Sequence, residues 1–234
     1  MNIGKSITYV MEDQEWVSKT LLAAIISNVP ILNLAWIGYL TEIIRNVSDH
    51  DPEPLPDWSR LGQNFISGLL LMLAGLIYSL PLLIIAVVPL FGILLGFIPA
   101  EENLQEYAAG AFGIALFILV CCIMVYAILL SFYLPGVMIN YARKGNFGSC
   151  FQIREIFDII FGNAGEYLLA LVAAIAASIG IGILISVVSV LFIWIICIGW
   201  ILLFIVGAVA NVWIGTIFAH LLGQVGSDYS STNS

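Results

Sequence analysis

Four long stretches of this chain contain no Asp, Glu, Lys, Arg or His: residues 20–41, 61–100, 107–142 and 167–219. Hydrophobic residues make up 62% of the 234 residues and charged residues 9%, whereas charged residues form about 25% of an average soluble protein. A water-soluble core cannot absorb so many uninterrupted apolar residues, but a lipid bilayer can. The sequence therefore predicts an integral membrane protein and excludes a soluble enzyme and a disordered chain.

The charge balance limits the partners. Seven Lys and Arg against fifteen Asp and Glu give a net charge of −8, so the chain lacks the basic surface that nucleic-acid binding requires. Residues 1–20 lack the cationic, apolar and small-residue regions of a cleaved signal peptide. The four cysteines show neither zinc-ligand spacing nor a disulfide framework. We interpret Cys121 and Cys122 as small apolar residues within a span and Cys150 as a buried free thiol.

The lengths of the apolar stretches predict an all-α fold, a polytopic transmembrane helical bundle. About 20 apolar residues cross the hydrocarbon core as a helix, which gives four full spans at about 64–88, 112–141, 167–192 and 198–222. The last stretch holds two of them and must turn back, which we expect near Trp194–Gly199. We expect a single integral membrane domain over residues 1–222, followed by a flexible tail at 223–234.

The first apolar stretch carries helix-breaking and polar residues at its centre. Asn28, Pro30 and Asn33 predict a broken helical segment over 18–46. If this segment spans, Lys5 and Lys19 face outside. If it folds back as a re-entrant hairpin, all seven basic residues of the chain face the cytoplasm. The positive-inside rule favours the hairpin and places the C-terminus in the cytoplasm.

Short amphipathic stretches precede the membrane entries. An interfacial helix is expected at 3–16, because Ile3, Ile7, Val10 and Met11 share one helical face. Similar stretches begin at Trp58 and at Cys150. We interpret the chain as three units, each an interfacial helix followed by a hairpin. The alternative is that these stretches are amphipathic only because they flank membrane spans.

Small residues recur every four positions in the last two spans, a spacing that permits close helix approach in membranes. We expect those spans to pack together through these residues, with Ser178 and Asn211 as polar contacts. The predicted helix-packing residues are Ser178, Gly182, Ser186, Gly207, Asn211 and Gly215.

No residue pattern indicates catalysis. The long apolar stretches hold no ionisable residue of the kind that ion-coupled transport uses, and no phosphate loop, HExxH or GxSxG motif is present. Asp49, His50, Asp51 and Glu53 match no closed metal site and are interpreted as a solvated acidic loop. We expect no enzyme activity, no catalytic or cofactor-binding residues, no metal and no cofactor.

Two blocks of sequence resemble an uncharacterised prokaryotic family of multi-span membrane proteins, domain of unknown function 4013. The first holds Gly38-Tyr39-Leu40, Arg45, Leu55-Pro56-Asp57-Trp58 and Gly68. The second holds Pro135-Gly136, Tyr141-Ala142, Gly145-Asn146-Phe147 and Phe151. The resemblance implies a bacterial or archaeal plasma membrane and brings no established activity. Within these blocks we interpret Arg45, Pro56 and Trp58 as interface anchors, with Trp58 at the bilayer surface and Arg45 beside lipid phosphate or Glu42.

Two functions remain open from the sequence. The first is a non-catalytic scaffold, accessory or membrane-organising protein that acts through helix packing. The alternative is a transporter or channel for a small or apolar solute, gated at the broken first segment. The expected partners are the lipid bilayer and other membrane proteins or a second copy of the chain, and no nucleic acid.

Overall fold

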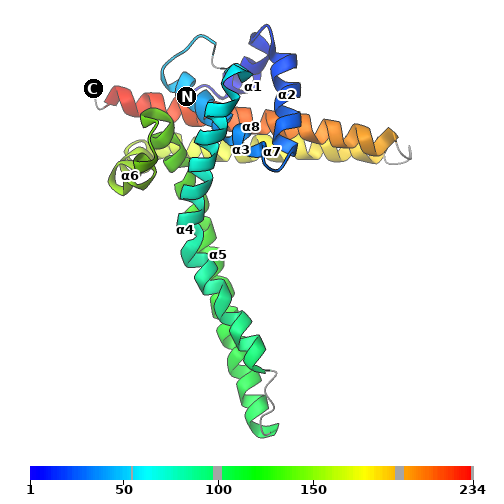
Figure 1. Cartoon of the computed structure of the whole chain (residues 1–234), viewed down its shortest axis with the longest axis vertical. Coiled ribbons are helices and arrows are strands. Elements are labelled where there is room, and N and C mark those ends of the chain that lie inside the picture. The colour runs from blue at the N-terminus through cyan, green and yellow to red at the C-terminus, as the bar shows by residue number, and fades with distance from the viewer. Residues whose placement is uncertain (54, 97–101, 193–197, 233–234) are drawn as a thin grey trace. The chain divides into compact units, whose positions relative to one another are not determined.

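The computed structural model describes residues 1–53, 55–96, 102–192 and 198–232. Every regular element in these ranges is helical, as predicted. Where one domain was expected, the chain divides into two compact units. Unit 1 comprises Met1–Met72 and Pro135–Ser234, and unit 2 comprises Leu73–Leu134. Figure 1 labels the helices.

Four helices are long and apolar enough to cross a membrane, which confirms the four predicted spans. The helices are α4 (Leu61–Gly96), α5 (Glu102–Lys144), α7 (Ala164–Phe192) and α8 (Ile198–Thr232). Their candidate spans are Trp58–Ile85, Leu116–Lys144, Ala164–Val190 and Gly199–Tyr229. The predicted turn near Trp194–Gly199 falls mainly on residues outside the described ranges.

A flexible tail was expected at 223–234, but α8 continues to Thr232, and only residues 233–234 of that range lie outside the described residues. The final turns pack against α3 (Asn33–Ser48). A Cβ added at Gly223 would meet Val47 at 2.5 Å, and one added at Gly226 would meet the Ser48 hydroxyl at 2.5 Å. The small residues at these positions therefore bring α8 close to α3, and the polar residues between them belong to a packed helix.

The broken N-terminal segment consists of α2 (Trp16–Asn28) and α3. Proline restricts the residue before it to extended backbone, and Val29 accordingly has φ −93° and ψ 118°. The Asn33 amide donates to the Ser27 carbonyl at 2.6 Å, and the Asn28 amide donates to the Ala24 carbonyl at 2.8 Å. Asn28, Pro30 and Asn33 thus form the connection between two helices that are each shorter than the roughly 20 residues of a span. Their depth in the membrane stays a prediction.

Two short helices have one buried and one exposed apolar face. In α1 (Ile3–Glu12), Tyr9 and Val10 are buried while Ile7 is 43% exposed. In α6 (Ile153–Gly162), Ile156 is buried and Phe161 is 67% exposed. An exposed apolar face suits a helix that lies at a bilayer interface. The helix predicted at 3–16 ends at Glu12, and Asp13 beyond it accepts a hydrogen bond from the backbone N–H of Glu15.

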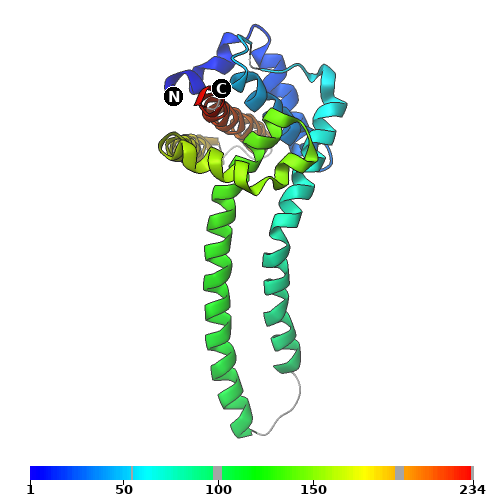
Figure 2. The same ribbon diagram turned by 90° about the vertical axis from the view of Figure 1, so that its left-hand side faces the viewer.

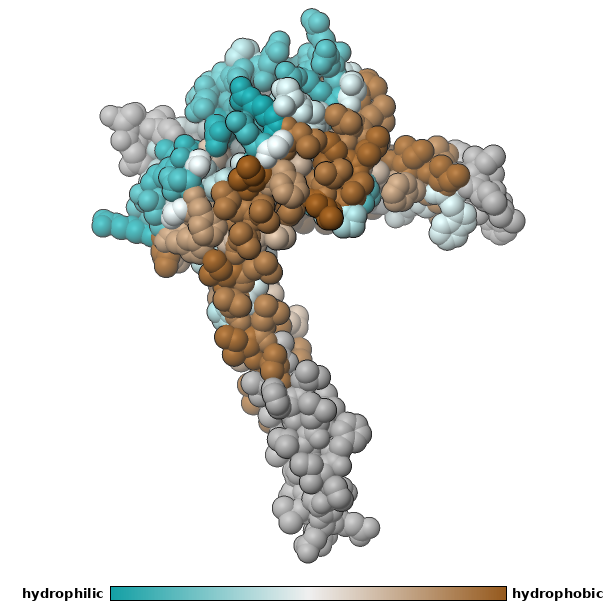
Figure 3. Space-filling view, in the orientation of Figure 1, coloured by the Kyte–Doolittle hydropathy of each residue, from teal (hydrophilic) through white to brown (hydrophobic). Residues whose placement is uncertain are grey.

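Unit 2 is a pair of helical segments from α4 and α5, which lie side by side in Figure 2. The Tyr126 hydroxyl donates to the Tyr78 carbonyl at 2.6 Å, and the Tyr78 and Tyr133 rings meet edge to face at 5.1 Å. Apolar side chains such as Ile118 and Leu129 are 57% and 62% exposed. Figure 3 shows hydrophobic residues over the described part of this unit and hydrophilic residues gathered on one side of unit 1.

Helix α7 packs along α8 as expected, but several of the residues predicted to bring them together face open space or make other contacts. Ala170 and Ala174 of α7 and Ala208 of α8 are buried. Gly182 and Gly207 have open space where a Cβ would lie, and Asn211 is exposed. The Ser178 and Ser186 hydroxyls donate to carbonyls of their own helix, those of Ala174 and Gly182. Gly215 accommodates the Trp36 ring of α3, which lies 2.7 Å from an added Cβ.

Candidate functional site

The first sequence block brings α3 and the beginning of α4 into backbone contact. A Cβ on Gly38 would overlap the Asn64 carbonyl and lie 2.7 Å from the α-carbon of Asn64. A Cβ on Gly68 would likewise overlap the Leu34 carbonyl. Helices can approach this closely only where a residue has no side chain. These two glycines therefore fix the crossing of α3 and α4.

Trp58 and Arg45, both predicted to anchor at the bilayer interface, make contacts inside the protein. The Trp58 ring stacks on Tyr39 at 4.3 Å between centroids, and its indole N–H donates to the Lys19 carbonyl at 3.1 Å. Arg45 Nε donates to the Ala142 carbonyl at 2.7 Å, so the side chain joins α3 to the end of α5. Pro56 is buried. These contacts, whose partners come from distant parts of the sequence, add a packing role inside the protein, and a position of the three residues at the bilayer interface stays a prediction.

The two sequence blocks meet at this junction. Gly145 has a φ of +68°, a conformation that favours glycine, and ends α5 with a hydrogen bond from its N–H to the Tyr141 carbonyl. An added Cβ on Gly145 would lie 3.5 Å from Arg45 Nη2. Asn146 then caps the 3₁₀ helix η2 (Phe147–Phe151) by accepting from the Ser149 N–H. The second sequence block thus sets the backbone conformation at the end of α5, where the Arg45 side chain makes its contacts.

A cavity of about 380 Å³ lies where these elements join. Three charged side chains line it: Glu42 and Arg45 from α3, and Arg60 from the 3₁₀ helix η1 (Trp58–Arg60). Asn64 and Tyr141 also line it. Arg60 Nη1 lies 3.4 Å from Glu42 Oε1. We call this the arginine cavity, and it carries two positive charges and one negative charge.

Two polar atoms beside the arginine cavity are buried without a hydrogen-bond partner among the described residues. They are Asn64 Nδ2 and Glu42 Oε2. Asn64 is only 4% exposed. An unsatisfied buried donor or acceptor costs about 1–3 kcal/mol, and such groups are rare in native structures. One donor and one acceptor therefore remain unpaired on residues that line the cavity.

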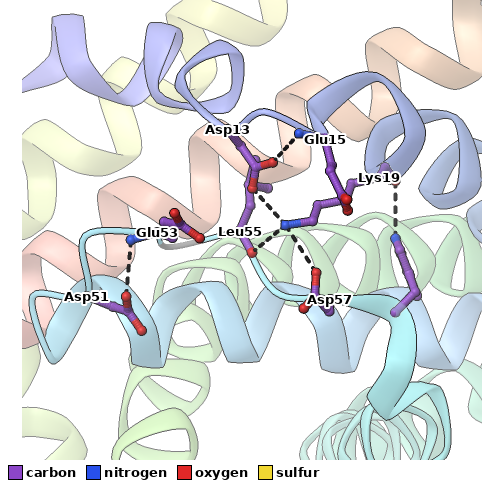
Figure 4. Close-up of polar contacts among 8 residues, drawn as sticks. Asp13, Glu15, Lys19, Asp51, Glu53, Leu55 and Asp57 are labelled. Carbon is purple, nitrogen blue, oxygen red and sulfur yellow. Dashed lines mark hydrogen bonds and ion pairs between the residues drawn. The ribbon is translucent and has the colours of Figure 1, made fainter.

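A second polar centre surrounds Lys19, and Figure 4 shows its contacts. Lys19 Nζ lies 2.7 Å from Asp13 Oδ2 and 3.2 Å from Asp57 Oδ1, and it donates to the Leu55 carbonyl at 3.3 Å. Burial lowers the pKa of Lys19, but the hydrogen bonds and charges of Asp13 and Asp57 outweigh it, so the pKa is raised. We call these residues the Lys19 cluster. It holds the loop before η1 against α2.

A further network joins α1 to the last turns of α8. Gln224 Nε2 donates to His220 Nδ1 at 2.9 Å, and the Ser6 hydroxyl lies 2.9 Å from the same ring nitrogen. The Asn2 N–H donates to Gln224 Oε1 at 2.6 Å. The Tyr9 hydroxyl donates to the Thr216 carbonyl at 3.0 Å, and burial raises the pKa of this phenol. These bonds use the polar groups of α1 to hold it on α8.

The acidic loop at Asp49–Glu53 forms no metal centre within the described residues. Asp51 Oδ1 accepts from the Glu53 N–H at 3.1 Å, an arrangement visible in Figure 4. Asp51 and Glu53 are exposed, and His50 has a φ of 59°. The polar groups thus serve the turn that follows α3.

Sequence reasoning missed Asn64, Glu42 and Arg60 as members of one cavity. Arg60 and Asn64 lie four residues apart, a spacing that places side chains on the same helical face. That spacing is visible in the sequence, but it also fits the polar side of an amphipathic stretch. The approach of α3 is needed to bring Glu42 and Arg45 beside them.

Four apolar helices of spanning length, short amphipathic helices beside them and no strand in the described ranges define a helical, multi-span membrane protein. The chain matches the model of the family described as "Protein of unknown function (DUF4013)" over residues 21–191, and it belongs to that family. This confirms the resemblance found in the two sequence blocks. No curated protein and no solved structure matches the chain.

Proposed function

We propose that this protein is a non-catalytic membrane scaffold, which organises other membrane proteins through its helices. The observation that carries the proposal is the exposure of its apolar spans. In the span Leu116–Lys144, none of the most apolar 18-residue window is buried by the chain itself. Such a surface needs lipid or the helices of other proteins around it. We further propose that the protein resides in a bacterial or archaeal plasma membrane with a cytoplasmic C-terminus.

The use of polar groups in unit 1 supports a scaffold over a transporter. Asn28 and Asn33, which could have lined a solute path, donate to backbone carbonyls of α2: Asn28 within its own helix, and Asn33 from α3. Lys19 is held by two carboxylates and a carbonyl. The Asn33 and Lys19 contacts tie separate short segments together, as a fixed platform requires.

Crosslinking in native membranes tests the proposal. A photoreactive amino acid replaces Ile118, which is 57% exposed, and in a matched control it replaces Ile139, which is fully buried. We expect adducts with a discrete membrane protein, or with a second copy, from position 118 and only internal adducts from position 139. Adducts with lipid alone from position 118 would contradict the scaffold.

A measurement of solute flux distinguishes the scaffold from the alternative function, a transporter or channel. Purified protein is reconstituted into liposomes that contain small ions or glycerol, and release is compared with that from empty liposomes. A scaffold gives no increase above the empty liposomes. Release that depends on the protein would support the transporter or channel and overturn the scaffold.

A further inference from the structure

The arginine cavity holds groups that suit a specific class of ligand. Arg45 and Arg60 come from separate elements, α3 and η1, and both line the same space. Arginine presents several N–H donors in a planar fork that matches phosphate oxygens. Arg45 uses Nε to hold the Ala142 carbonyl, an arrangement that fixes its guanidinium in place. A ligand would therefore meet a positioned donor and not a flexible one.

The buried Asn64 amide is an independent indication of a ligand. Its Nδ2 has no hydrogen-bond partner among the residues that the structure describes, although Asn64 is only 4% exposed. The backbone of Asn64 is fixed where Gly38 meets it. An amide held at a cavity wall without a partner can donate to an anion that enters the cavity.

Glu42 restricts the ligand further. Its Oε1 faces Arg60, whereas Oε2 is buried without a partner in the described part of the chain. A bare anion would leave this acceptor unsatisfied and would be repelled by its charge. A ligand that carries an ammonium or hydroxyl group beside its phosphate satisfies both requirements, because such a group donates to Oε2.

The position of the cavity favours a membrane source for such a ligand. Ile66 and Leu70 are among the residues that line it, and Ile66 is 58% exposed. Both belong to the first half of the candidate span Trp58–Ile85. Head groups of phospholipids lie at the ends of membrane spans, and their acyl chains extend along the apolar surface.

We propose that the arginine cavity binds a phosphate ester whose neighbouring group is a hydrogen-bond donor. Arg45, Arg60 and Asn64 donate to the phosphate oxygens, and Glu42 accepts from the neighbouring ammonium or hydroxyl. A phospholipid head group such as phosphoethanolamine and a soluble phosphate compound share this chemistry. Neither source depends on the scaffold function proposed above.

Thermal unfolding of the delipidated full chain in detergent tests the site with three probes. Short-chain phosphatidylethanolamine carries both the phosphate and the donor. Short-chain phosphatidylcholine carries the phosphate without an N–H, and inorganic phosphate lacks the apolar chains. We expect phosphatidylethanolamine to raise the melting temperature most. An equal rise with inorganic phosphate would identify free phosphate compounds as the source, and an equal rise with phosphatidylcholine would overturn the role of Glu42.

Variants link the response to the cavity. Asn64→Leu and Arg60→Gln should weaken apparent binding by at least about tenfold, the factor that loss of one charge-assisted hydrogen bond gives. Arg154→Gln, at an exposed arginine outside the cavity, is the matched control and should respond like the wild type. Without ligand, Asn64→Leu should keep or increase the melting temperature, because it removes an unsatisfied amide. A merely structural Asn64 predicts the reverse.

Two results would overturn the proposal. One is the absence of any melting-temperature rise with all three probes. The other is a ligand-induced rise in the melting temperature of Arg60→Gln that equals the rise in the wild type. If Asn64→Leu does not fold, Arg60→Gln alone is sufficient for the test.

Discussion

Gly38→Ala should be among the most damaging single-methyl additions in this protein. The added Cβ would overlap the Asn64 carbonyl and lie 2.7 Å from the α-carbon of Asn64, whereas ordinary van der Waals separations begin at 3.4 Å. The helices would have to move apart by about 0.7 Å to relieve the overlap with that α-carbon, and further to relieve the overlap with the carbonyl. No side chain can rotate away, because both groups belong to the backbone of α4.

The size of the expected loss in stability follows from the kind of contact that the added methyl group would disturb. Overpacking usually costs about 1–3 kcal/mol when side chains can adjust, so we expect about 3 kcal/mol at this backbone crossing. For a chain of 150–250 residues, each kcal/mol shifts the melting temperature by about 2–4 °C. Gly38→Ala should therefore lower it by about 6–12 °C.

The assay is thermal unfolding in mild detergent, monitored by circular dichroism. Gly182→Ala is the matched control, because a Cβ there meets nothing within 4 Å. The control should be neutral or stabilised by up to about 1 kcal/mol through helix propensity. A Gly38→Ala protein as stable as the wild type, or a control equally destabilised, would refute the reasoning.

Three further predictions concern unit 1. Trp58→Phe keeps the stack on Tyr39 but loses the hydrogen bond to the Lys19 carbonyl. Thermal unfolding should show that the free energy of unfolding falls by about 0.5–1.5 kcal/mol. An unchanged melting temperature would show that this hydrogen bond does not stabilise the fold. Because its folded-state pKa is raised, Lys19 should stabilise the fold fully below about pH 10.4, the ordinary lysine value, and lose this contribution as pH rises through the raised value. Melting temperatures of wild type and Lys19→Met should therefore converge at high pH, with the exposed Lys5→Met as control, and a constant difference would contradict the ion pairs. Burial raises the pKa of Cys150 to about 11, so maleimide should label a variant containing only this cysteine after unfolding and not before; rapid labelling of the folded protein would show that the thiol is accessible.

The membrane spans were predictable because their cause is local and continuous. A helix in hydrocarbon needs an uninterrupted apolar length, and this length is visible in one sequence. The break at Asn28–Asn33 was predictable for a related reason, since Pro30 restricts the backbone on its N-terminal side. These features require no knowledge of what packs against them.

The contacts of Trp58 and Arg45 were not predictable, because their partners lie far away in sequence. Trp58 bonds to the Lys19 carbonyl, and Arg45 bonds to the Ala142 carbonyl. A backbone carbonyl carries no residue signature. Sequence reasoning therefore favours interface anchors for both side chains, which is the usual role of these residue types near membrane ends.

The glycines also show that sequence patterns do not identify packing partners. Gly182 and Gly207 have the four-residue spacing of packing helices but meet open space, whereas Gly38 and Gly68 meet backbone. Spacing identifies a face of small residues but not the element that covers it. The arginine cavity depends on the helix crossing at Gly38, so the sequence alone could not predict it either.

The contact between Asn2 and Gln224 has a consequence for how the chain is threaded through the bilayer. Residues joined by direct hydrogen bonds lie at the same membrane face, so the chain between them returns to the side on which it started and crosses an even number of times. Four crossings meet this parity and five do not, which supports a first segment that enters and returns. Halves of a split fluorescent protein attached to the two ends should accordingly assemble in one compartment.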